Sequence, residues 1–167
     1  MKPSPHASDI NLRQRLAGAR RIAVVGIGDE NSAVDRLGME AAREIELMHL
    51  PGVRVFFAGT VPESMTGPLR EFHPDHILLL DAADMDSPPG TVALIDPEKI
   101  PKSHFSTHAL PLSAVMEFLE KDTGANVTLI GIQPDMRRDE TRLSHEGQDF
   151  LNRNFGELAG ILREICG

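Results

Sequence analysis

The sequence predicts an α/β fold in which a mainly parallel sheet is covered by helices on both faces. Short apolar runs rich in β-branched residues alternate along the chain with longer segments whose apolar residues recur every three or four positions. Strands joined by helical crossovers run parallel, and such sheets are covered on both faces. With 167 residues, 41% of them apolar, the chain is long enough for one domain with a filled core.

The first third of the chain predicts helix, strand and helix in that order. Residues 9–20 are expected to form a short amphipathic helix with Ser8 as its N-cap. Residues 22–28 form a continuous apolar run ended by glycine, which is typical of a strand buried on both faces. A polar loop follows over residues 29–34. A helix is predicted from Asp35, and its apolar face comprises Gly38, Ala41, Ala42, Ile45 and Met48.

The middle of the chain predicts three more strands. Residues 53–58 read as the second strand, and residues 65–72 as a helix weakened by a glycine and a proline. The third strand covers residues 77–80 and ends in Asp81. Residues 91–95 predict a fourth, more exposed strand.

The last third predicts a long loop, two helices and a fifth strand. Residues 96–110 carry two prolines, two serines and two histidines, and they indicate a loop with at most one helical turn. A helix then follows, marked by Leu112, Val115, Met116 and Leu119. Residues 127–132 predict the fifth strand, and the apolar positions between 150 and 165 predict a long C-terminal helix.

Charge and composition narrow the classes of function. The chain holds 17 basic and 25 acidic residues, a formal net charge of −8, which argues against nucleic-acid binding. Cys166 is the only cysteine, so no internal disulfide forms. No apolar run approaches the ~20 residues of a membrane span, and the start of the chain is polar. We expect a cytoplasmic single domain over residues 1–167 with a flexible tail over 1–8, and the oligomeric state stays open.

Three residues stand out as a candidate site because of where they fall between the predicted elements. Asp35 lies between the first strand and its helix, Asp81 ends the third strand, and His108 lies in the loop before the helix at Leu112. In parallel sheets, ligands bind beyond the carboxyl ends of the strands. Two carboxylates and an imidazole at that edge would bind a divalent metal ion and leave coordination positions open for water or substrate.

Each of these residues also has an ordinary structural explanation. Asp35 is a good helix N-cap, Asp81 could end a strand and hold a turn, and His108 could be a solvated loop residue. His73 and His76 resemble a ligand pair, but Pro74 between them favours a turn at the opposite edge of the sheet.

A second interpretation is a nucleotide-binding domain. Gly26 and Gly28 follow a strand as in the dinucleotide-binding fingerprint. The third glycine of that fingerprint would fall at position 31, which is Asn31, and no acidic residue stands clearly at the end of a strand about 20 residues later. The motif is therefore broken, and it supports a nucleotide site weakly.

An ordered set of short segments runs along most of the chain: Val25–Gly28, Asp35–Gly38, Gly59–Glu63, Leu80–Met85, Ile95–Pro97, Ser106–Leu112 and Gly131–Asp135. Through this set, over about residues 21–165, the chain resembles the nickel–iron hydrogenase maturation endopeptidases, most closely the branch that processes the formate-hydrogenlyase type of hydrogenase. The resemblance implies a compact three-layer α/β sandwich around a twisted, mainly parallel five-stranded sheet.

The resemblance also implies a function and a metal. Members of the family remove a C-terminal extension from the hydrogenase large-subunit precursor once nickel has been inserted. The three metal-contacting positions of the family fall on Asp35, Asp81 and His108, which would therefore act in catalysis and contact the nickel carried by the precursor. Cadmium or another divalent ion is expected to bind there in crystals. Glu63 and Asp84 also fall near this edge and could contact the ligand residues or the substrate, but they are not predicted as ligands.

One loop departs from the family pattern. The usual loop has glycines and two acidic residues before the helix, whereas this chain has Ala33, Val34, Asp35 and Arg36. Ala33 and Arg36 restrict the backbone where glycine would allow close approach. Arg36 opposes metal binding at Asp35 unless it points away or pairs with Asp29, Glu30 or the substrate. A non-catalytic chaperone that binds the precursor is therefore an alternative.

Overall fold

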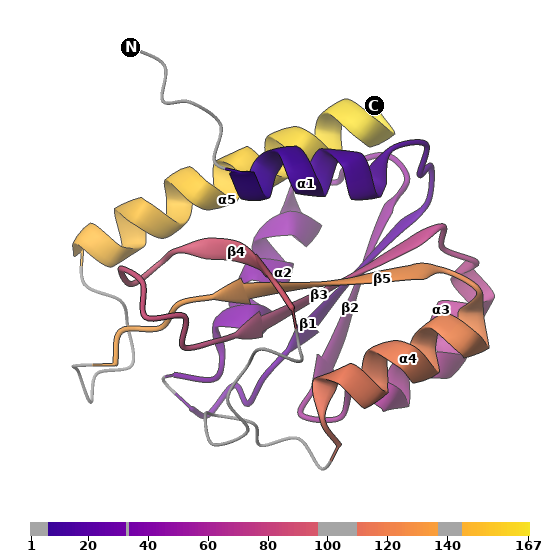
Figure 1. Cartoon of the computed structure of the whole chain (residues 1–167), viewed down its shortest axis with the longest axis horizontal. Coiled ribbons are helices and arrows are strands. Elements are labelled where there is room, and N and C mark those ends of the chain that lie inside the picture. The colour runs from indigo at the N-terminus through magenta and orange to yellow at the C-terminus, as the bar shows by residue number, and fades with distance from the viewer. Residues whose placement is uncertain (1–6, 33, 97–109, 137–144) are drawn as a thin grey trace.

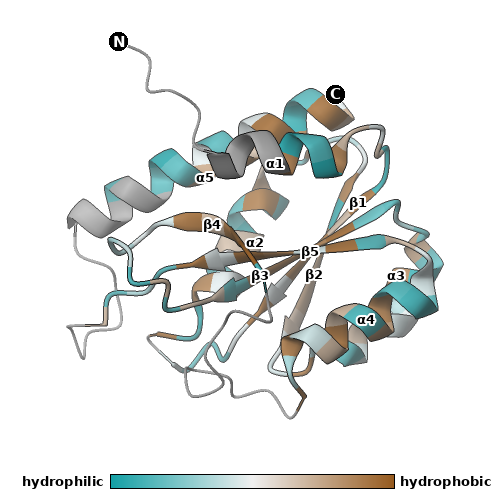
Figure 2. Ribbon diagram, viewed as in Figure 1, coloured by the Kyte–Doolittle hydropathy of each residue, from teal (hydrophilic) through white to brown (hydrophobic). Residues whose placement is uncertain are grey.

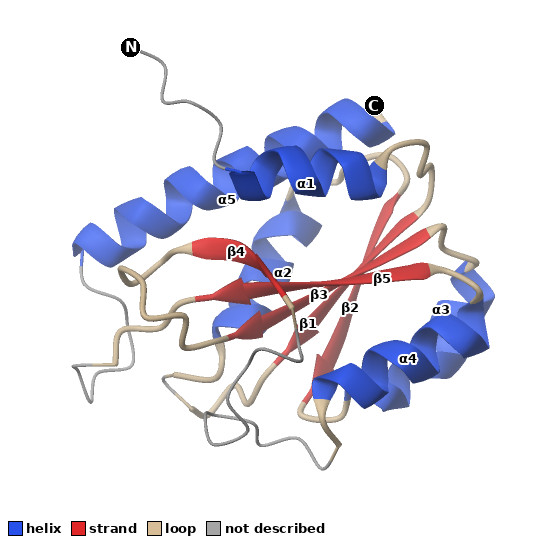
Figure 3. Cartoon of the chain, in the orientation of Figure 1, coloured by secondary structure: helices blue, strands red, loops and turns tan. Residues whose placement is uncertain are grey.

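The computed structural model describes residues 7–32, 34–96, 110–136 and 145–167. They form five strands, a short 3-10 helix and five α-helices (Figures 1 and 3). In chain order these elements are α1 (Ala7–Leu16), β1 (Ile22–Ile27), α2 (Leu37–Leu47), β2 (Val53–Gly59), η1 (Pro62–Met65), α3 (Thr66–Phe72), β3 (His76–Ala82), β4 (Val92–Ile95), α4 (Leu112–Thr123), β5 (Asn126–Ile132) and α5 (His145–Cys166).

The five strands form one sheet in the order β2-β1-β3-β5-β4. Four of them run parallel, and β4 pairs antiparallel with β5 at one edge. The predicted mainly parallel sheet of five strands is thus confirmed. The central strands β1 and β3 are buried along their whole length, which explains why their sequences are continuous apolar runs rather than alternating ones.

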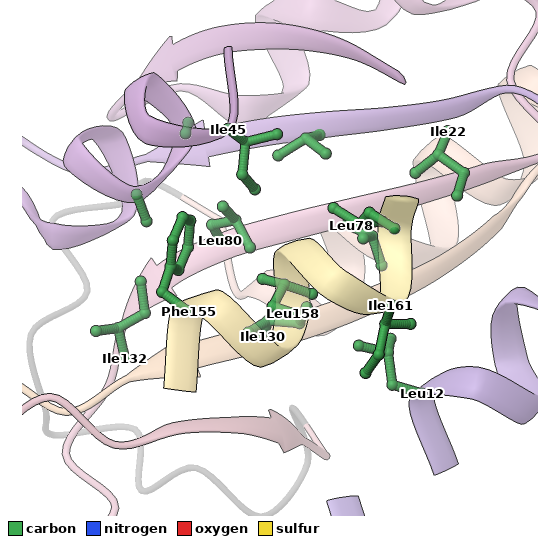
Figure 4. Close-up of a cluster of buried hydrophobic side chains, with 14 of the residues drawn as sticks. Leu12, Ile22, Ile45, Leu78, Leu80, Ile130, Ile132, Phe155, Leu158 and Ile161 are labelled. Carbon is green, nitrogen blue, oxygen red and sulfur yellow. The ribbon is translucent and has the colours of Figure 1, made fainter. Parts of the chain in front are cut away.

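The two faces of the sheet each bury a separate apolar cluster. Alternate residues of the strands pack against α1, α2 and α5 on one face and against α3 and α4 on the other. Figure 1 shows α1 and α5 side by side on one side of the sheet and α3 and α4 together on the other. Figure 4 shows Phe155, Leu158 and Ile161 of α5 turned toward Leu78, Leu80 and Ile130 of the sheet. In Figure 2 the strands are largely hydrophobic, and hydrophilic residues mark the helices.

Glycines allow α2 to lie unusually close to β1. A Cβ atom on Gly26 would lie 2.6 Å from the Cβ of Ala42 and 3.0 Å from the carbonyl oxygen of Gly38. The first distance is too short for any side chain and the second is unusually tight, so the helix can lie this close only against a glycine. This contact fixes where α2 begins, and therefore where the preceding loop lies.

The structure corrects the N-terminal helix. It spans Ala7–Leu16 rather than residues 9–20, so Ser8 lies inside the helix and is not its N-cap, and residues 7 and 8 are not part of a tail. Gly18, with a φ of 80°, follows its end and takes the left-handed conformation that stops helices. The strand β3 is also longer than predicted, and Asp81 is its penultimate residue. In the described ranges no helix is both long and apolar enough to cross a membrane.

Candidate functional site

The strand order places a topological switch point between β1 and β3. After β1 the chain enters α2 on one face of the sheet, whereas after β3 it passes through β4 to α4 on the other face. The two loops therefore diverge at the carboxyl ends of neighbouring strands, which is where open α/β sheets bind ligands. Asp35 lies in the loop after β1, and Asp81 lies at the end of β3.

Asp35 is buried, with 4% of its surface exposed, and its side chain organises the loop around it. Its Oδ2 accepts a hydrogen bond of 2.9 Å from the backbone N–H of Asp29. Its own N–H donates to Ser32 Oγ at 3.2 Å. The N-cap of α2 is Arg36, which makes no side-chain capping bond. The N-cap explanation of Asp35 is therefore wrong, because its carboxylate braces the loop rather than the helix.

A second glycine contact brings the Asp35 loop to the end of β3. A Cβ atom on Gly38 would lie 2.3 Å from the carbonyl oxygen of Ile27 and 2.2 Å from that of Leu80. The first turn of α2 therefore rests directly on backbone carbonyls near the carboxyl ends of β1 and β3. Asp35 precedes Gly38 by three residues and Asp81 follows Leu80, so both carboxylates belong to the same edge of the sheet, at the switch point.

Asp81 is also buried, with 7% of its surface exposed. It pairs in register with Gly131 of β5. A Cβ atom on Gly131 would lie 1.9 Å from Cδ1 of Ile95, so the Ile95 side chain occupies the space beside Asp81 that a residue at 131 would otherwise fill. In β3, Ile77 and Leu79 face α3 and α4, and the alternation of the strand places Asp81 on that same face.

His108 lies outside the described residues. What the structure does describe is the start of α4 at Leu112, which lies at the carboxyl edge of the sheet because the helix runs back to Asn126 at the opposite edge. The described ranges contain no group of three histidine, cysteine, aspartate or glutamate side chains arranged to hold a metal. Asp35 and Asp81 are thus placed at one edge, and the third predicted ligand stays a prediction.

Arg36 pairs with a different acid from those expected. Its Nε lies 2.9 Å from Oε1 of Glu40, one turn further along α2. Glu30 instead pairs with Arg43, whose guanidinium also lies 5.6 Å from the ring centroid of Phe57. The cation beside Asp35 is therefore partly balanced by a carboxylate of the helix itself.

The protein's own backbone fills the space beside the glycine that follows β1. A Cβ atom on Gly28 would lie 1.9 Å from the carbonyl oxygen of Asp35, so the loop folds back onto this residue. In a dinucleotide site the corresponding glycine lets the cofactor approach the backbone. The geometry therefore disfavours the nucleotide-binding alternative.

The His73–His76 segment forms a turn at the opposite edge of the sheet, as predicted. His73 is the C-cap of α3 with a φ of 53°, and His76 begins β3. His76 is 3% exposed, and its Nε2 shares a hydrogen bond of 2.8 Å with Thr128 Oγ1. Burial lowers the pKa of His76 to about 4, with a smaller contribution from the charge of Arg15.

Gln133 is a residue of this edge that the sequence pattern did not single out. It follows β5 directly, is 2% exposed, and donates to Oδ1 of Asp84 at 3.2 Å. A glutamine directly before a proline at the end of an apolar strand is visible in the sequence, but its partners in the loop after β3 are not. Glu63, in η1 after β2, and Asp84, two residues beyond β3, lie at the same edge as expected.

The family model of the hydrogenase maturation proteases matches residues 18–159 of this chain. A Methanocaldococcus jannaschii protein described as a candidate hydrogenase maturation protease is 34% identical over 131 residues, which are 74% of this chain and 78% of the relative. The hydrogenase 3 maturation protease of Escherichia coli is 37% identical over 83 residues, 49% of this chain and 53% of the relative.

Solved structures give the same result over nearly the whole chain. The crystal structure of the NiFe hydrogenase maturation protease HycI from Thermococcus kodakarensis superposes with a TM-score of 0.71 at 31% sequence identity. The superposition covers 93% of this chain and 98% of that one. The similarity therefore extends over the domain as a whole.

Proposed function

This chain belongs to the hydrogenase maturation protease family, a group of hydrolases, and we propose that it removes a C-terminal extension from the large-subunit precursor of a nickel–iron hydrogenase. The single observation that supports this proposal most is the pair of buried carboxylates at the switch point. Asp35 and Asp81 are 4% and 7% exposed, and they lie at the same edge of the sheet although Asp35 belongs to the loop after β1 and Asp81 to β3. Burying a carboxylate is costly, and two buried carboxylates beyond the ends of parallel strands are typical of a functional site.

Nickel enters this proposal as part of the substrate. Asp35, Asp81 and His108 would contact the nickel already bound in the precursor, since carboxylate oxygens and imidazole nitrogen are suitable ligands for a divalent transition metal. A precursor without nickel would lack this anchor and would stay uncut. Cleavage would then report that metal insertion is complete.

The chain's own residues supply the rigidity that such recognition needs. The Asp29 N–H holds one oxygen of Asp35, and the contact of Gly38 with the carbonyls of Ile27 and Leu80 holds the loop against β3. Because these contacts fix the loop, the carboxylate of Asp35 keeps its place before the substrate arrives, and less ordering entropy is lost on binding.

The first prediction tests the carboxylates. Asp35→Asn and Asp81→Asn are each expected to lower the rate of precursor cleavage at least ~100-fold, because the amide keeps the shape of the side chain but loses the charge that a metal needs. The measurement is the mass of nickel-loaded precursor after incubation with each variant, and circular dichroism checks that the variant is folded.

The matched control is Asp149→Asn, an exposed aspartate on α5, which should cleave like the wild type. Nickel-free precursor should stay intact with every protein. Full activity of either buried variant would overturn the assignment of the site. Binding of nickel-loaded precursor by the wild type with no change of its mass would instead favour the chaperone alternative. Comparing precursors of different hydrogenase types in the same assay tests the predicted formate-hydrogenlyase branch.

A further inference from the structure

The strands β3 and β5 separate just beyond the candidate site, and Gln133 lies at the point of separation. The last backbone hydrogen bond between these two strands is the one that the Ala83 N–H donates to the carbonyl of Ile132, at 3.0 Å. The loop that leaves β3 returns past Gln133 before β4. There, the Gly90 N–H donates to the Gln133 carbonyl at 2.8 Å, and the Gln133 N–H donates to the Thr91 carbonyl at 2.9 Å.

The side chain of Gln133 continues the ladder where the backbones no longer pair. Its Oε1 accepts a hydrogen bond from the Met85 N–H at 2.5 Å. Its Nε2 donates to Oδ1 of Asp84 and to the carbonyl of Pro134, both at 3.2 Å. Both N–H groups of the amide are thus used, and its oxygen is paired as well. The side chain therefore binds the departing loop in a single orientation.

The chemistry of this contact is specific to glutamine. A glutamate would have no donor for Asp84 and would place two carboxylates at hydrogen-bond distance. A methionine has a similar length but would leave the half-buried Asp84 carboxylate and Met85 N–H without these bonds. The segment held in this way begins three residues after Asp81.

We propose that Gln133 is a positioning residue of the peptidase site, one that fixes the segment from Asp81 to Met85 through its amide. This inference rests on the proposed function of Asp81. The ladder bond at Ala83 and the two side-chain bonds at Asp84 and Met85 hold three consecutive residues against β5. Losing the two side-chain bonds loosens the segment that leaves β3 while the ladder itself stays paired, and the carboxylate of Asp81 at the end of that strand then samples directions that do not contact the substrate. A misplacement of about 1 Å at a site can cost ~100-fold in rate.

The test uses two substitutions that together exchange the donor and the acceptor between positions 133 and 84. Gln133→Glu should lower kcat for nickel-loaded precursor at least ~10-fold while KM changes less than ~2-fold. The reason is that the surface that binds the precursor is unchanged, whereas the Asp81 carboxylate loses its orientation. In the double variant Gln133→Glu with Asp84→Asn, the asparagine donates to the new carboxylate, which still accepts from Met85 N–H. Its kcat should exceed that of Gln133→Glu at least ~3-fold. A double variant as slow as Gln133→Glu would overturn the proposal.

A measurement independent of activity separates this inference from the proposed function. Amide hydrogen exchange at Met85 should be at least ~10-fold faster in Gln133→Met than in the wild type, with other amides of β3 protected as before. If exchange accelerates while kcat is unchanged, Gln133 is structural only and the positioning role is wrong. If Met85 exchanges as in the wild type, the amide contact itself is wrong. If the wild type cleaves no precursor, it is the proposed function that fails.

Discussion

Arg36 is a cation beside a carboxylate of the candidate site, and the next turn of α2 supplies its counter-charge. The Nε of Arg36 lies 2.9 Å from Oε1 of Glu40. A half-exposed pair spaced by four residues contributes only ~0.3–0.5 kcal/mol to helix stability, so its importance lies elsewhere. It holds the guanidinium against a carboxylate one turn further along the helix.

A second prediction follows at Glu40. Glu40→Gln removes the counter-charge, so Arg36 is expected to compete with the positively charged metal for Asp35 and to raise KM for nickel-loaded precursor ~3- to 10-fold. The melting temperature should change by no more than ~2 °C. Steady-state kinetics measure the effect, with Glu44→Gln, an exposed residue of the same helix, as control. The double variant with Arg36→Gln should recover KM, and an unchanged KM in Glu40→Gln would contradict this role of the pair.

The residues of the site differ in how far the sequence could predict them. Asp35 and Asp81 could be placed at one edge from element order alone, because parallel strands all end at the same edge. Gly38 could not be recognised, since its role depends on the carbonyls of Ile27 and Leu80, which meet only in the fold. Gln133 has the same character, because its partners lie in a loop whose path no local pattern encodes.

At the scale of elements, β3 and β5 run side by side from the amino-terminal edge of the sheet to its carboxyl-terminal edge. At their amino ends His76 and Thr128 share a buried hydrogen bond of 2.8 Å, and at their carboxyl ends Gln133 binds the departing loop. The sequence predicted both strands from their apolar runs, but it left out His76, the first residue of β3. A histidine extends a buried strand only when a partner such as Thr128 satisfies its ring nitrogen.

The third prediction concerns pH. Burial lowers the pKa of His76 from about 6.5 to about 4, so between these values the unfolded chain binds the proton and the native one does not. The free energy of unfolding should therefore fall as pH drops from about 6.5 to about 4, by up to ~3 kcal/mol, and His76 should add no further change above that range. Urea unfolding at pH 7, 5.5 and 4.5 measures it.

The variant His76→Gln keeps a polar partner for Thr128 without a titrating group. The difference in stability between wild type and variant should shrink or reverse toward low pH, because only the wild type incurs the cost of a charged buried histidine. His49→Asn, at an exposed residue with a φ of 47° that asparagine tolerates, serves as control. Parallel pH dependence of wild type and His76→Gln would show that His76 titrates normally.

At the scale of the whole molecule, the order of strands and helices determines the topology of the sheet, and this topology determines which loops meet at its carboxyl edge. Alternating strands and helices predicted a mainly parallel sheet, and the structure adds what alternation cannot encode. The position of β1 at the switch point depends on α2 and α3 lying on opposite faces, and α2 reaches its place through the glycine contacts with β1. The end of α1 was predicted too late in the chain because Gly18, which follows the helix in the left-handed conformation, reads in sequence as an interior residue.

We expect the apolar core to supply the stability of the protein and the carboxyl edge of the sheet its activity, and the last prediction tests this division. Leu158, 3% exposed in the cluster between α5 and the sheet, lies far along the chain from every site residue. Leu158→Ala should lower the free energy of unfolding by ~2–5 kcal/mol through the lost contacts and the cavity. Its kcat for precursor cleavage at 25 °C should stay within ~2-fold of the wild type, provided that the protein remains folded.

Asp81→Asn should behave in the opposite way. Replacing a buried carboxylate by its neutral isostere removes a desolvation cost, so the melting temperature should equal or exceed that of the wild type while cleavage is lost. Thermal unfolding and precursor mass, measured on the same two preparations, give both quantities. Loss of cleavage by a fully folded Leu158→Ala would show that the core and the carboxyl edge are coupled. Strong destabilisation of Asp81→Asn would show that Asp81 serves folding, and its assignment to substrate contact would be wrong.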